Sequence, residues 1–350
     1  MIVDLLSQGD RQHARALIEG AGLSFEADVE ELVGVHEDGV LVGTAARQGD
    51  VLKLFAIDPA AQGGGLLGEL AGDLLRRAFE AGHESVFVFT KPEYAGSFEQ
   101  LNFELLATAG QAALLEHGGG LSRYLEAQRG LLRPGKNGAV VVNANPFTLG
   151  HRYLVEEAAA RCDTLYVFVV EEDRSAFPFE LRRRLVAAGC ADLQNVKVLG
   201  SGHYAVSAQT FPSYFLKRDE DIPALQMEID LTLFSERIAP FFSLGARFVG
   251  HEPYCTTTRQ YNETMQQVLP RCGLELQVIE RRLVGADQPG GAESDKAFIS
   301  ATRVRQALRE EGPSAPVLSQ LVPPTTLAIL RSAEVQPIIE ELRQGQGRHS

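Results

Sequence analysis

The stretch Val140–His151, VVVNANPFTLGH, joins an apolar β-branched run to residues that could bind an anion. The apolar run predicts a buried strand, and the residues from His151 onward predict an amphipathic helix. The carboxyl end of a parallel strand and the unpaired N–H groups of the next helix together favour phosphate. Gly150 would let the backbone approach closely, and His151 would donate a hydrogen bond. The predicted site residues here are Asn143, Asn145, Pro146, Phe147, Thr148, Gly150 and His151.

A second candidate lies far downstream, in Phe298–Leu308, FISATRVRQAL. A Ser or Thr cap gathers backbone N–H groups at a helix start, and an Arg just inside the helix supplies a bidentate donor to phosphate. Alone, this pattern is equally typical of a capped basic surface helix. Its pairing with the first motif favours an anion site. The predicted residues are Ser300, Thr302, Arg303 and Arg305.

A third candidate is the glycine-rich turn Gln62, Gly63, Gly64 and Gly65, which stands between an expected strand and an expected helix. Backbone N–H groups in such a turn can cradle a diphosphate at the helix N-terminus. An ordinary tight turn before a helix is a serious alternative interpretation of the same residues.

Other charged or polar residues carry weaker signals. Lys136 could reach a phosphate, although a solvated loop lysine is the more typical role. Glu171–Asp173 follow a strand end, where carboxylates could hold Mg²⁺ or simply form an acidic loop. Arg182–Arg184 are typical of a solvated helix face that could also meet an acidic partner. Gly250 ends an expected strand near the site, and Cys162 is expected to pack in a helix.

Two α/β series must position these residues. The first, up to about residue 130, predicts a mixed sheet with a hairpin around Glu37–Gly39 and a strong amphipathic helix over 65–83. Gly- and Pro-rich turns between 118 and 138 predict a domain junction. After it, strands alternate with helices, which favours a parallel, doubly wound sheet. The expected domains are residues 1–130 and 136–335, followed by a frayed tail over 336–350.

The amino-acid composition limits the classes of function that this chain can have. The chain has 350 residues, 45% of them hydrophobic and 23% charged, as in ordinary globular proteins of two domains. The net charge of −13 argues against wholesale binding to nucleic acid or to an anionic membrane. The N-terminus does not read as a secretory signal, and four scattered cysteines suggest free thiols in a reducing cytoplasm. We therefore expect a cytoplasmic protein with no nucleic-acid or membrane partner.

The motifs TLGH and ISATRVR resemble the (H/T)xGH and ISSTxxR signatures of the nucleotidyltransferase superfamily. More narrowly, VVNANPFTLGHRYLVEEAA resembles the citrate (pro-3S)-lyase ligase family, in which Thr is the usual first residue of the motif. The pieces EEDRSAFPFELRRRLV, TFPSYFLK, EIDLTLF, RFVGHEPYCTTTRQYN and LVPPTTL are also similar to that family. The resemblance covers nearly the whole chain.

This resemblance implies an ATP- and Mg²⁺-dependent acid–thiol ligase with a Rossmann-like nucleotidyltransferase domain. Acetate would become acetyl-adenylate, and the acetyl group would pass to a thiol. That thiol belongs to the phosphoribosyl-dephospho-CoA arm of the acyl carrier subunit of citrate lyase. His151, Thr148 and Arg305 would take catalytic roles. The ATP-binding roles would fall to Asn143, Asn145, Pro146, Phe147, Gly150, Gly250, Ser300, Thr302 and Arg303.

The turn at Gln62–Gly65 resembles motif A of GNAT acetyltransferases, which implies an N-terminal GNAT-like domain that could hold the CoA-derived arm. Three alternatives stay open. One is another adenylyltransferase of the same superfamily, of the pantetheine-phosphate or nicotinamide-mononucleotide type. A second is a GNAT acetyltransferase whose other half only senses nucleotide, against which Leu67 in the cradle argues. A third is a non-catalytic module that docks the lyase carrier.

Overall fold

The computed structural model describes residues 1–171, 175–205, 211–212, 214–216, 221–251, 256–280 and 299–344. It forms two compact units, the first made of Met1–Ala127 and Val206–Leu233, the second of Gln128–Ala205 and Phe234–Ser350. The expected ranges 1–130 and 136–335 stay a prediction for the domain boundaries. Helix α7 (Ile222–Leu233) falls inside the second range but belongs to the first compact unit.

The sheet of the first unit has, among the described residues, seven strands in the order β1-β2-β3-β4-β5-β7-β6. All neighbours are antiparallel except β4 and β5, which are parallel. The strands are β1 (Ile2–Asp4), β2 (Glu31–Glu37), β3 (Val40–Gln48), β4 (Val51–Ile57), β5 (Val86–Thr90), β6 (Glu104–Ala109) and β7 (Ala112–His117). The helices are α1 (Gln8–Gly20), α2 (Leu66–Glu80), α3 (Pro92–Glu99), α4 (Gly120–Ala127) and α7.

Strands β4 and β5 separate soon after they meet. Their register holds only two pairs, Val51 with Phe87 and Leu52 with Val88. Leu54 then adopts a positive φ of 60°, a conformation that non-glycine residues rarely take. The two strands therefore diverge toward their carboxyl ends, which opens space inside the unit between β4, β5, α2 and α3.

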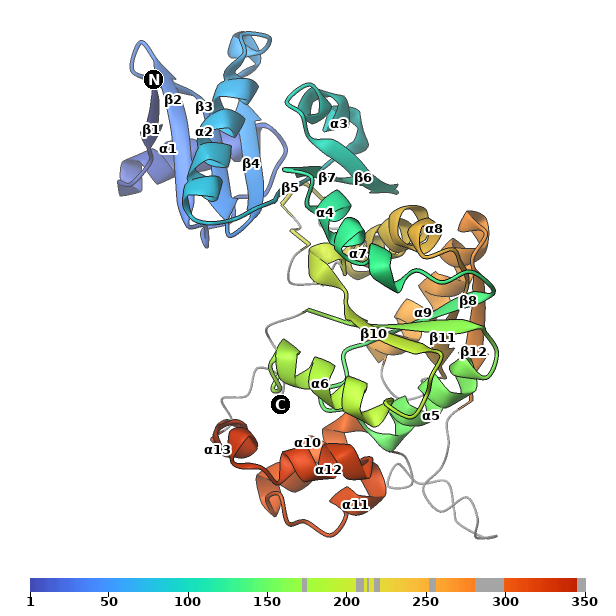
Figure 1. The fold of residues 1–350 in the computed structure, drawn as a ribbon. Helices are drawn as coiled ribbons and strands as arrows, with labels where there is room; N and C mark the ends of the chain where they lie inside the picture. Colours follow the sequence, from blue (N-terminus) through green and yellow to red (C-terminus); the bar gives the residue numbers. More distant parts are fainter. Residues whose placement is uncertain are drawn as a thin grey trace. The chain divides into compact units, whose positions relative to one another are not determined.

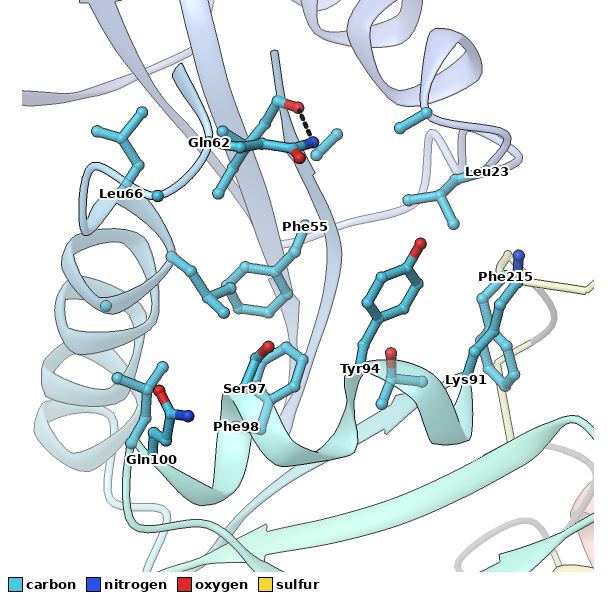
Figure 2. A pocket seen from close by; sticks show the side chains of 18 of the residues that line it. Leu23, Phe55, Gln62, Leu66, Lys91, Tyr94, Ser97, Phe98, Gln100 and Phe215 are labelled. Carbon is cyan, nitrogen blue, oxygen red and sulfur yellow. Dashed lines mark hydrogen bonds between the residues drawn. The ribbon is translucent and has the colours of Figure 1, made fainter. Parts of the chain in front are cut away.

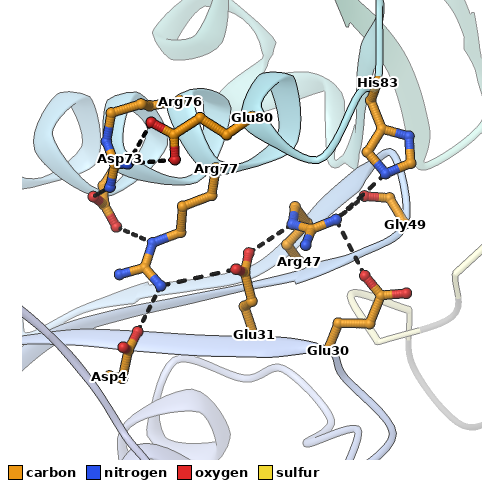
Figure 3. Close-up of polar contacts among 10 residues, drawn as sticks. All are labelled: Asp4, Glu30, Glu31, Arg47, Gly49, Asp73, Arg76, Arg77, Glu80 and His83. Atoms are coloured by element: carbon orange, nitrogen blue, oxygen red, sulfur yellow. Dashed lines mark hydrogen bonds and ion pairs between the residues drawn. The ribbon is translucent and has the colours of Figure 1, made fainter.

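Ion pairs tie α2 to the edge of this sheet (Figure 3). Arg77 reaches Asp4 on β1 at 2.6 Å and Asp73 in its own helix at 2.7 Å. Arg47 on β3 is buried and reaches Glu31 on β2 at 2.6 Å. Arg77 therefore holds α2 against β1, while the Arg47 pair joins β2 to β3 within the sheet.

The sheet of the second unit has, in the described part of the chain, five parallel strands in the order β10-β9-β8-β11-β12 (Figure 1). The strands are β8 (Asn137–Val142), β9 (Thr164–Val169), β10 (Val196–Gly200), β11 (Leu244–Gly250) and β12 (Glu275–Ile279). The chain winds outward from β8 in one direction and from β11 in the other. The switch point of the doubly wound sheet therefore lies between β8 and β11, where such folds bind ligands.

Helices α5 (Leu149–Ala159), α6 (Phe179–Gly189) and α8 (Ala239–Phe241) contact this sheet, and a π-helical turn η4 (Phe234–Ile238) precedes α8. The other described helices of the unit are α9 (Thr256–Val268), α10 (Ala301–Glu310), α11 (Leu318–Leu321), α12 (Pro324–Leu330) and α13 (Gln336–Arg343). Short 3-10 turns are η1 (Pro59–Ala61), η2 (Arg129–Leu131), η3 (Gly202–Tyr204), η5 (Leu269–Cys272) and η7 (Ala333–Val335). Figure 1 shows α10, α11 and α12 gathered beside α5 and α6, and α11 contacts α5 while α12 contacts α6.

The α/β class, with a mixed sheet followed by a parallel doubly wound sheet, is confirmed. The expected frayed tail over 336–350 is wrong for its first half. Residues 336–343 form α13, and Ile339 and Leu342 are buried in the same core as Val304 and Leu308 of α10. These apolar residues stand three positions apart and so lie on one face of the helix. Burial of that face against the core stabilises the helix.

Candidate active site

The corner between β8 and α5 is closed by two residues of the TLGH motif. Thr148 is the N-cap of α5, and its hydroxyl oxygen accepts a hydrogen bond from the backbone N–H of His151 at 3.3 Å. The His151 side chain returns the contact, because its Nδ1 accepts the backbone N–H of Thr148 at 3.0 Å. This reciprocal capping box fixes both side chains at the helix N-terminus.

The contacts also decide which ring nitrogen of His151 carries hydrogen. Since Nδ1 accepts a backbone N–H, and lies 2.9 Å from the hydroxyl oxygen of Thr148, the neutral ring must carry its hydrogen on Nε2. The ring stacks on Phe147, with 5.8 Å between centroids and 15° between planes, and Phe147 is fully buried. His151 is therefore held as an oriented Nε2–H donor.

The two motifs meet in space, as the sequence predicted. A Cβ added at Gly150 would lie 3.3 Å from the carbonyl oxygen of Ile299, so glycine lets the first turn of α5 pack against the start of the ISATR segment. Ser300 caps α10, and its hydroxyl oxygen accepts the backbone N–H of Arg303 at 3.3 Å. Two capped helix N-termini thus lie next to each other.

Arg305 links the motifs directly. Its Nη1 donates to the carbonyl oxygen of Asn145 at 2.8 Å and its Nη2 to the hydroxyl of Thr302 at 3.3 Å. Among the described residues, no carboxylate forms an ion pair with it, and burial lowers the pKa of Arg305. A half-buried guanidinium that only neutral oxygens contact has unused capacity for an anion.

Asn143 and Asn145 play a role that the sequence did not indicate. The side-chain oxygen of Asn145 accepts the backbone N–H of Phe177 at 3.0 Å. The side-chain oxygen of Asn143 accepts from the hydroxyl of Ser175 at 3.0 Å and from Arg182 at 2.8 Å. These amides hold the loop before α6 against the corner, and their part in binding ATP stays a prediction. Pro146 follows Asn145 through a cis peptide bond and is buried.

The interpretation of Arg182 as part of a solvated face is wrong. Its side chain is completely buried and donates to the carbonyl oxygens of Phe177, Asn143 and Val170 at 2.7–2.9 Å. Carbonyls at the ends of a strand and a loop gather around one guanidinium, which sequence spacing alone does not reveal. The neighbouring Arg184 is exposed and pairs with Glu334 at 2.7 Å.

The remaining candidates are dispersed. Gly250 ends β11 at the switch point, and a Cβ there would meet nothing within 4 Å. One oxygen of Glu171 accepts the N–H of Gly202 at 3.0 Å, and Glu172 and Asp173 lie outside the described residues. The backbone of Lys136 pairs with Asp163: its N–H donates to the Asp163 carboxylate at 2.7 Å, and its carbonyl oxygen accepts the backbone N–H of Asp163 at 2.7 Å. Burial raises the pKa of Cys162 to about 11.

Within the described ranges, no group of three or more His, Cys, Asp or Glu side chains lies close enough to hold a metal ion. The same ranges contain no helix with the length and apolar character needed to cross a membrane.

The first unit contains a cavity of about 580 Å³ where β4 and β5 diverge (Figure 2). The Gln62–Gly65 turn lies at its edge, and Gly63 and Gly65 have φ values of 83° and 86° that favour glycine. Figure 2 shows Leu66 at one end of the cavity and Phe215 at the other. The described lining residues include no Asp or Glu; they are Ala21, Leu23, Phe55, Ala56, Ile57, Ala61, Gln62, Gly63, Gly65, Leu66, Leu67, Gly68, Thr90, Lys91, Tyr94, Ser97, Phe98, Gln100, Leu101, Tyr214 and Phe215.

The sequence did not indicate that Tyr214 and Phe215 line this cavity, because they stand more than 100 positions after the Gln62–Gly65 turn. The hydroxyl of Tyr214 donates to the carbonyl oxygen of Phe89 at 2.7 Å, and burial raises the pKa of Tyr214. The apolar and aromatic character of TFPSYF was the only signal available for a buried role.

Residues 137–330, which contain both motifs and the switch point, match the family model of the citrate lyase ligase C-terminal domain. The citrate (pro-3S)-lyase ligase of Klebsiella pneumoniae is 41% identical over 313 residues, which cover 88% of this chain and 89% of that protein. The chain belongs to the citrate lyase ligase family. Another member, from Escherichia coli strain K12, is 38% identical over 92% of this chain and 89% of its own length.

The chain is also similar to a solved structure, the ribosomal-protein-S18-alanine N-acetyltransferase of Escherichia coli. The match has 16% sequence identity and a TM-score of 0.28, and it covers 33% of this chain and 90% of that protein. As a member of the citrate lyase ligase family, the chain is a ligase, and its TLGH and ISATRVR motifs lie inside the matched domain.

Proposed function

We propose that this chain activates citrate lyase by attaching an acetyl group, at the expense of ATP, to the thiol of the lyase's acyl carrier subunit. The observation that carries the proposal is the convergence of His151, Arg305 and two capped helix N-termini at the switch point of a parallel sheet. Family membership supplies the reaction class, and the corner supplies the groups that an adenylating ligase requires.

The first step forms acetyl-adenylate. A carboxylate oxygen of acetate attacks the α-phosphorus of ATP, and the bond to pyrophosphate breaks. Both reactants are anions, so the step depends on positioning and on cationic stabilisation. The N-terminal N–H groups of α5, the Nε2–H of His151 and the guanidinium of Arg305 would hold the phosphates. Mg²⁺ enters with ATP as part of the substrate.

Each residue has a separate task in this step. His151 donates from Nε2 to a phosphoryl oxygen, because Nδ1 is occupied by the backbone of Thr148. Thr148 orients that ring from the N-cap position. Arg305 balances charge that develops on the leaving pyrophosphate, and the Ser300 cap gathers the first N–H groups of α10 behind it. Gly250 would lie beside the adenosine at the end of β11.

The second step transfers the acetyl group. The carrier thiol attacks the carbonyl carbon of acetyl-adenylate, AMP leaves, and the thiol proton is released. The thiol sits on a long arm derived from CoA. The cavity of the first unit suits such an arm, since it has an apolar lining and a glycine turn at a helix N-terminus that can bind a diphosphate. The described lining contains no carboxylate that could serve as a general base.

In this proposal the cavity of the GNAT-like domain holds the arm of the carrier subunit. The reaction consumes ATP and a reduced thiol, which fits the cytoplasmic location predicted from the sequence.

The test is to mix the chain with ATP, Mg²⁺, acetate and deacetylated citrate lyase. Acetate-dependent release of AMP and pyrophosphate, with recovery of lyase activity, is expected; a chain that gives neither product contradicts the proposal.

A further inference from the structure

Asn143 follows the last residue of β8 and is exposed at the carboxyl edge of the parallel sheet. Ala144 is buried and adopts a positive φ of 52°, so the chain turns away from the strand direction at this point. The register between β8 and β11 ends at Val140 with Phe248, although both strands continue for two more residues. Asn143 therefore lies where the pairing of the two central strands has ended.

Two hydrogen bonds fix the direction in which the Asn143 amide points. Its Oδ1 accepts from Nη1 of Arg182 at 2.8 Å and from the hydroxyl of Ser175 at 3.0 Å. A guanidinium can only donate, so the amide atom beside it must be the oxygen. Arg182 is completely buried and also donates to the carbonyl oxygens of Asn143 and Val170, which fixes its own position. The Nδ2 of Asn143 must therefore point away from Arg182.

The Nδ2 group of Asn143 remains available for a ligand. Within the described ranges, the hydrogen bonds of the Asn143 side chain all go to its oxygen. An amide held through its oxygen is an oriented neutral donor, just as His151 is held through Nδ1 and donates from Nε2. Because this donor is already in place, binding to it orders few additional groups.

We infer that Nδ2 of Asn143 donates to one carboxylate oxygen of acetate and holds the ion for attack on the α-phosphorus of ATP. The inference rests on the proposed function, which supplies acetate as the acyl substrate. The other carboxylate oxygen forms the new bond to phosphorus. Pyrophosphate leaves with the electron pair of the bond that breaks, and no proton is transferred.

The order of groups along the corner favours acetate over phosphate at Asn143. His151, Arg305 and the capped starts of α5 and α10 lie at the helix end of the corner, where they would hold the triphosphate. An in-line displacement needs the attacking oxygen on the side of the α-phosphorus opposite the leaving pyrophosphate. Asn143 stands at the strand end of the same corner, so it can place acetate away from the pyrophosphate.

A neutral donor also suits a nucleophile. A cation bound to acetate would stabilise the charge on the oxygen that must attack and so make that oxygen less reactive. An amide N–H binds one oxygen by a weaker contact and leaves most of the charge on the carboxylate. The amide thus positions acetate without suppressing its reactivity.

Asn143→Asp tests the donor alone, because it is isosteric and keeps the oxygen that Arg182 and Ser175 hold. We expect the KM for acetate in the pyrophosphate-release assay to rise about 10- to 100-fold, since a hydrogen bond to a charged group is lost. Asn143→Leu removes the donor without adding charge. It should show a similar rise for acetate, while its KM for ATP stays within about threefold of the unaltered chain.

Gln194→Glu is the matched control for the added charge. Gln194 is exposed in the turn before β10, at the opposite edge of the sheet, and this variant should alter neither KM. An unchanged KM for acetate in Asn143→Asp overturns the inference and leaves Asn143 to hold the loop through its oxygen. A rise in the KM for ATP without a rise for acetate in Asn143→Leu also overturns it. So does failure of both variants to fold, because an exposed donor can be lost without unfolding the chain.

A binding measurement separates this inference from the proposed function. With Mg²⁺ and the α,β-methylene analogue of ATP present, sodium acetate is compared with sodium chloride at equal ionic strength. Acetate should raise the melting temperature of the unaltered chain and not that of Asn143→Asp. Equal stabilisation of both chains, or of neither, overturns the inference. If acetate stabilises only the unaltered chain but no acetate-dependent pyrophosphate appears with ATP, the site stands and the proposed function fails.

Discussion

At the scale of single residues, Thr148 orients the ring of His151, and His151 is the hydrogen-bond donor. The backbone N–H of Thr148 and its hydroxyl both lie against Nδ1, which leaves the Nε2–H as the donor of the ring. A histidine at a helix start is often only a cap. Here one set of contacts both caps the helix and orients the donor. Thr148→Ser keeps the capping oxygen, whereas His151→Ala removes the donor, so the two variants separate the effect on stability from the effect on catalysis.

His151→Ala should lower the rate of acetyl-adenylate formation by about 10²-fold or more, because a donor to the transferring phosphoryl group is lost. Acetate-dependent pyrophosphate release is the measurement. Thr148→Ser keeps the capping oxygen and should stay close to the unaltered rate. A near-normal rate in His151→Ala would reduce the residue to a helix cap.

Arg305 is expected to bind the phosphates of ATP. Arg305→Met should raise the KM for ATP roughly 10- to 100-fold, since a charge-assisted contact to phosphate is removed from a half-buried position. The control is Arg309→Met, one turn further along α10, where the side chain is exposed and 3.8 Å from Glu310. Equal kinetic losses in both variants would contradict a specific role for Arg305.

At the scale of elements, the site depends on how closely α5 approaches the segment before α10. Gly150→Ala should place a methyl group 3.3 Å from the carbonyl oxygen of Ile299 and push the two helix starts apart by a few tenths of an ångström. We expect a rate loss on the order of three- to tenfold, since small displacements of catalytic groups are costly. The free energy of unfolding should change little, because Ala also favours the helix.

Gly245→Ala is the matched control for this prediction. Gly245 lies near the start of β11, and an added Cβ there meets only the carbonyl oxygen of Asn137, at an ordinary contact distance of 3.9 Å. The pyrophosphate-release rate of this variant should stay within about twofold of the unaltered chain. If Gly150→Ala were as active as Gly245→Ala, the close contact between the two motifs would not matter for the reaction.

The sequence predicted the elements with strong periodicity, such as β8, α5 and α2, and the two capped motifs with their residues. It did not predict that β11 neighbours β8, since pairing of distant parallel strands leaves no local signal. For the same reason Arg182 was interpreted as solvated and Tyr214 was not assigned to a cavity. Helices α3 and α13 were missed because short elements owe their stability to tertiary packing.

At the scale of the whole molecule, the two proposed half-reactions fall in two compact units. In the proposed mechanism, adenylation takes place at the parallel sheet, and the cavity of the mixed sheet holds the carrier arm. The net charge of −13 does not itself attract a phosphate-bearing arm, so binding of the arm must rely on local contacts such as the glycine turn. Changes in the cavity should therefore affect the carrier and leave the first half-reaction unchanged.

Ser97→Trp tests this division by filling the cavity from α3. We expect the KM for the carrier subunit to rise on the order of tenfold, because a contact used only for binding is lost, while acetate-dependent pyrophosphate release without carrier stays the same. Glu99→Trp adds the same bulk on the same helix at an exposed position that does not line the cavity. A parallel loss of both half-reactions in Ser97→Trp would argue against separate sites.

The corner at the β8–β11 switch point is proposed to make acetyl-adenylate for the carrier thiol. The most direct measurement follows AMP, pyrophosphate and lyase activity together when the chain is given ATP, Mg²⁺, acetate and deacetylated citrate lyase. We predict AMP and pyrophosphate in equal amounts, only with acetate, and a matching recovery of lyase activity. Release of ADP, or transfer of AMP to phosphopantetheine in place of acetate, would contradict the account.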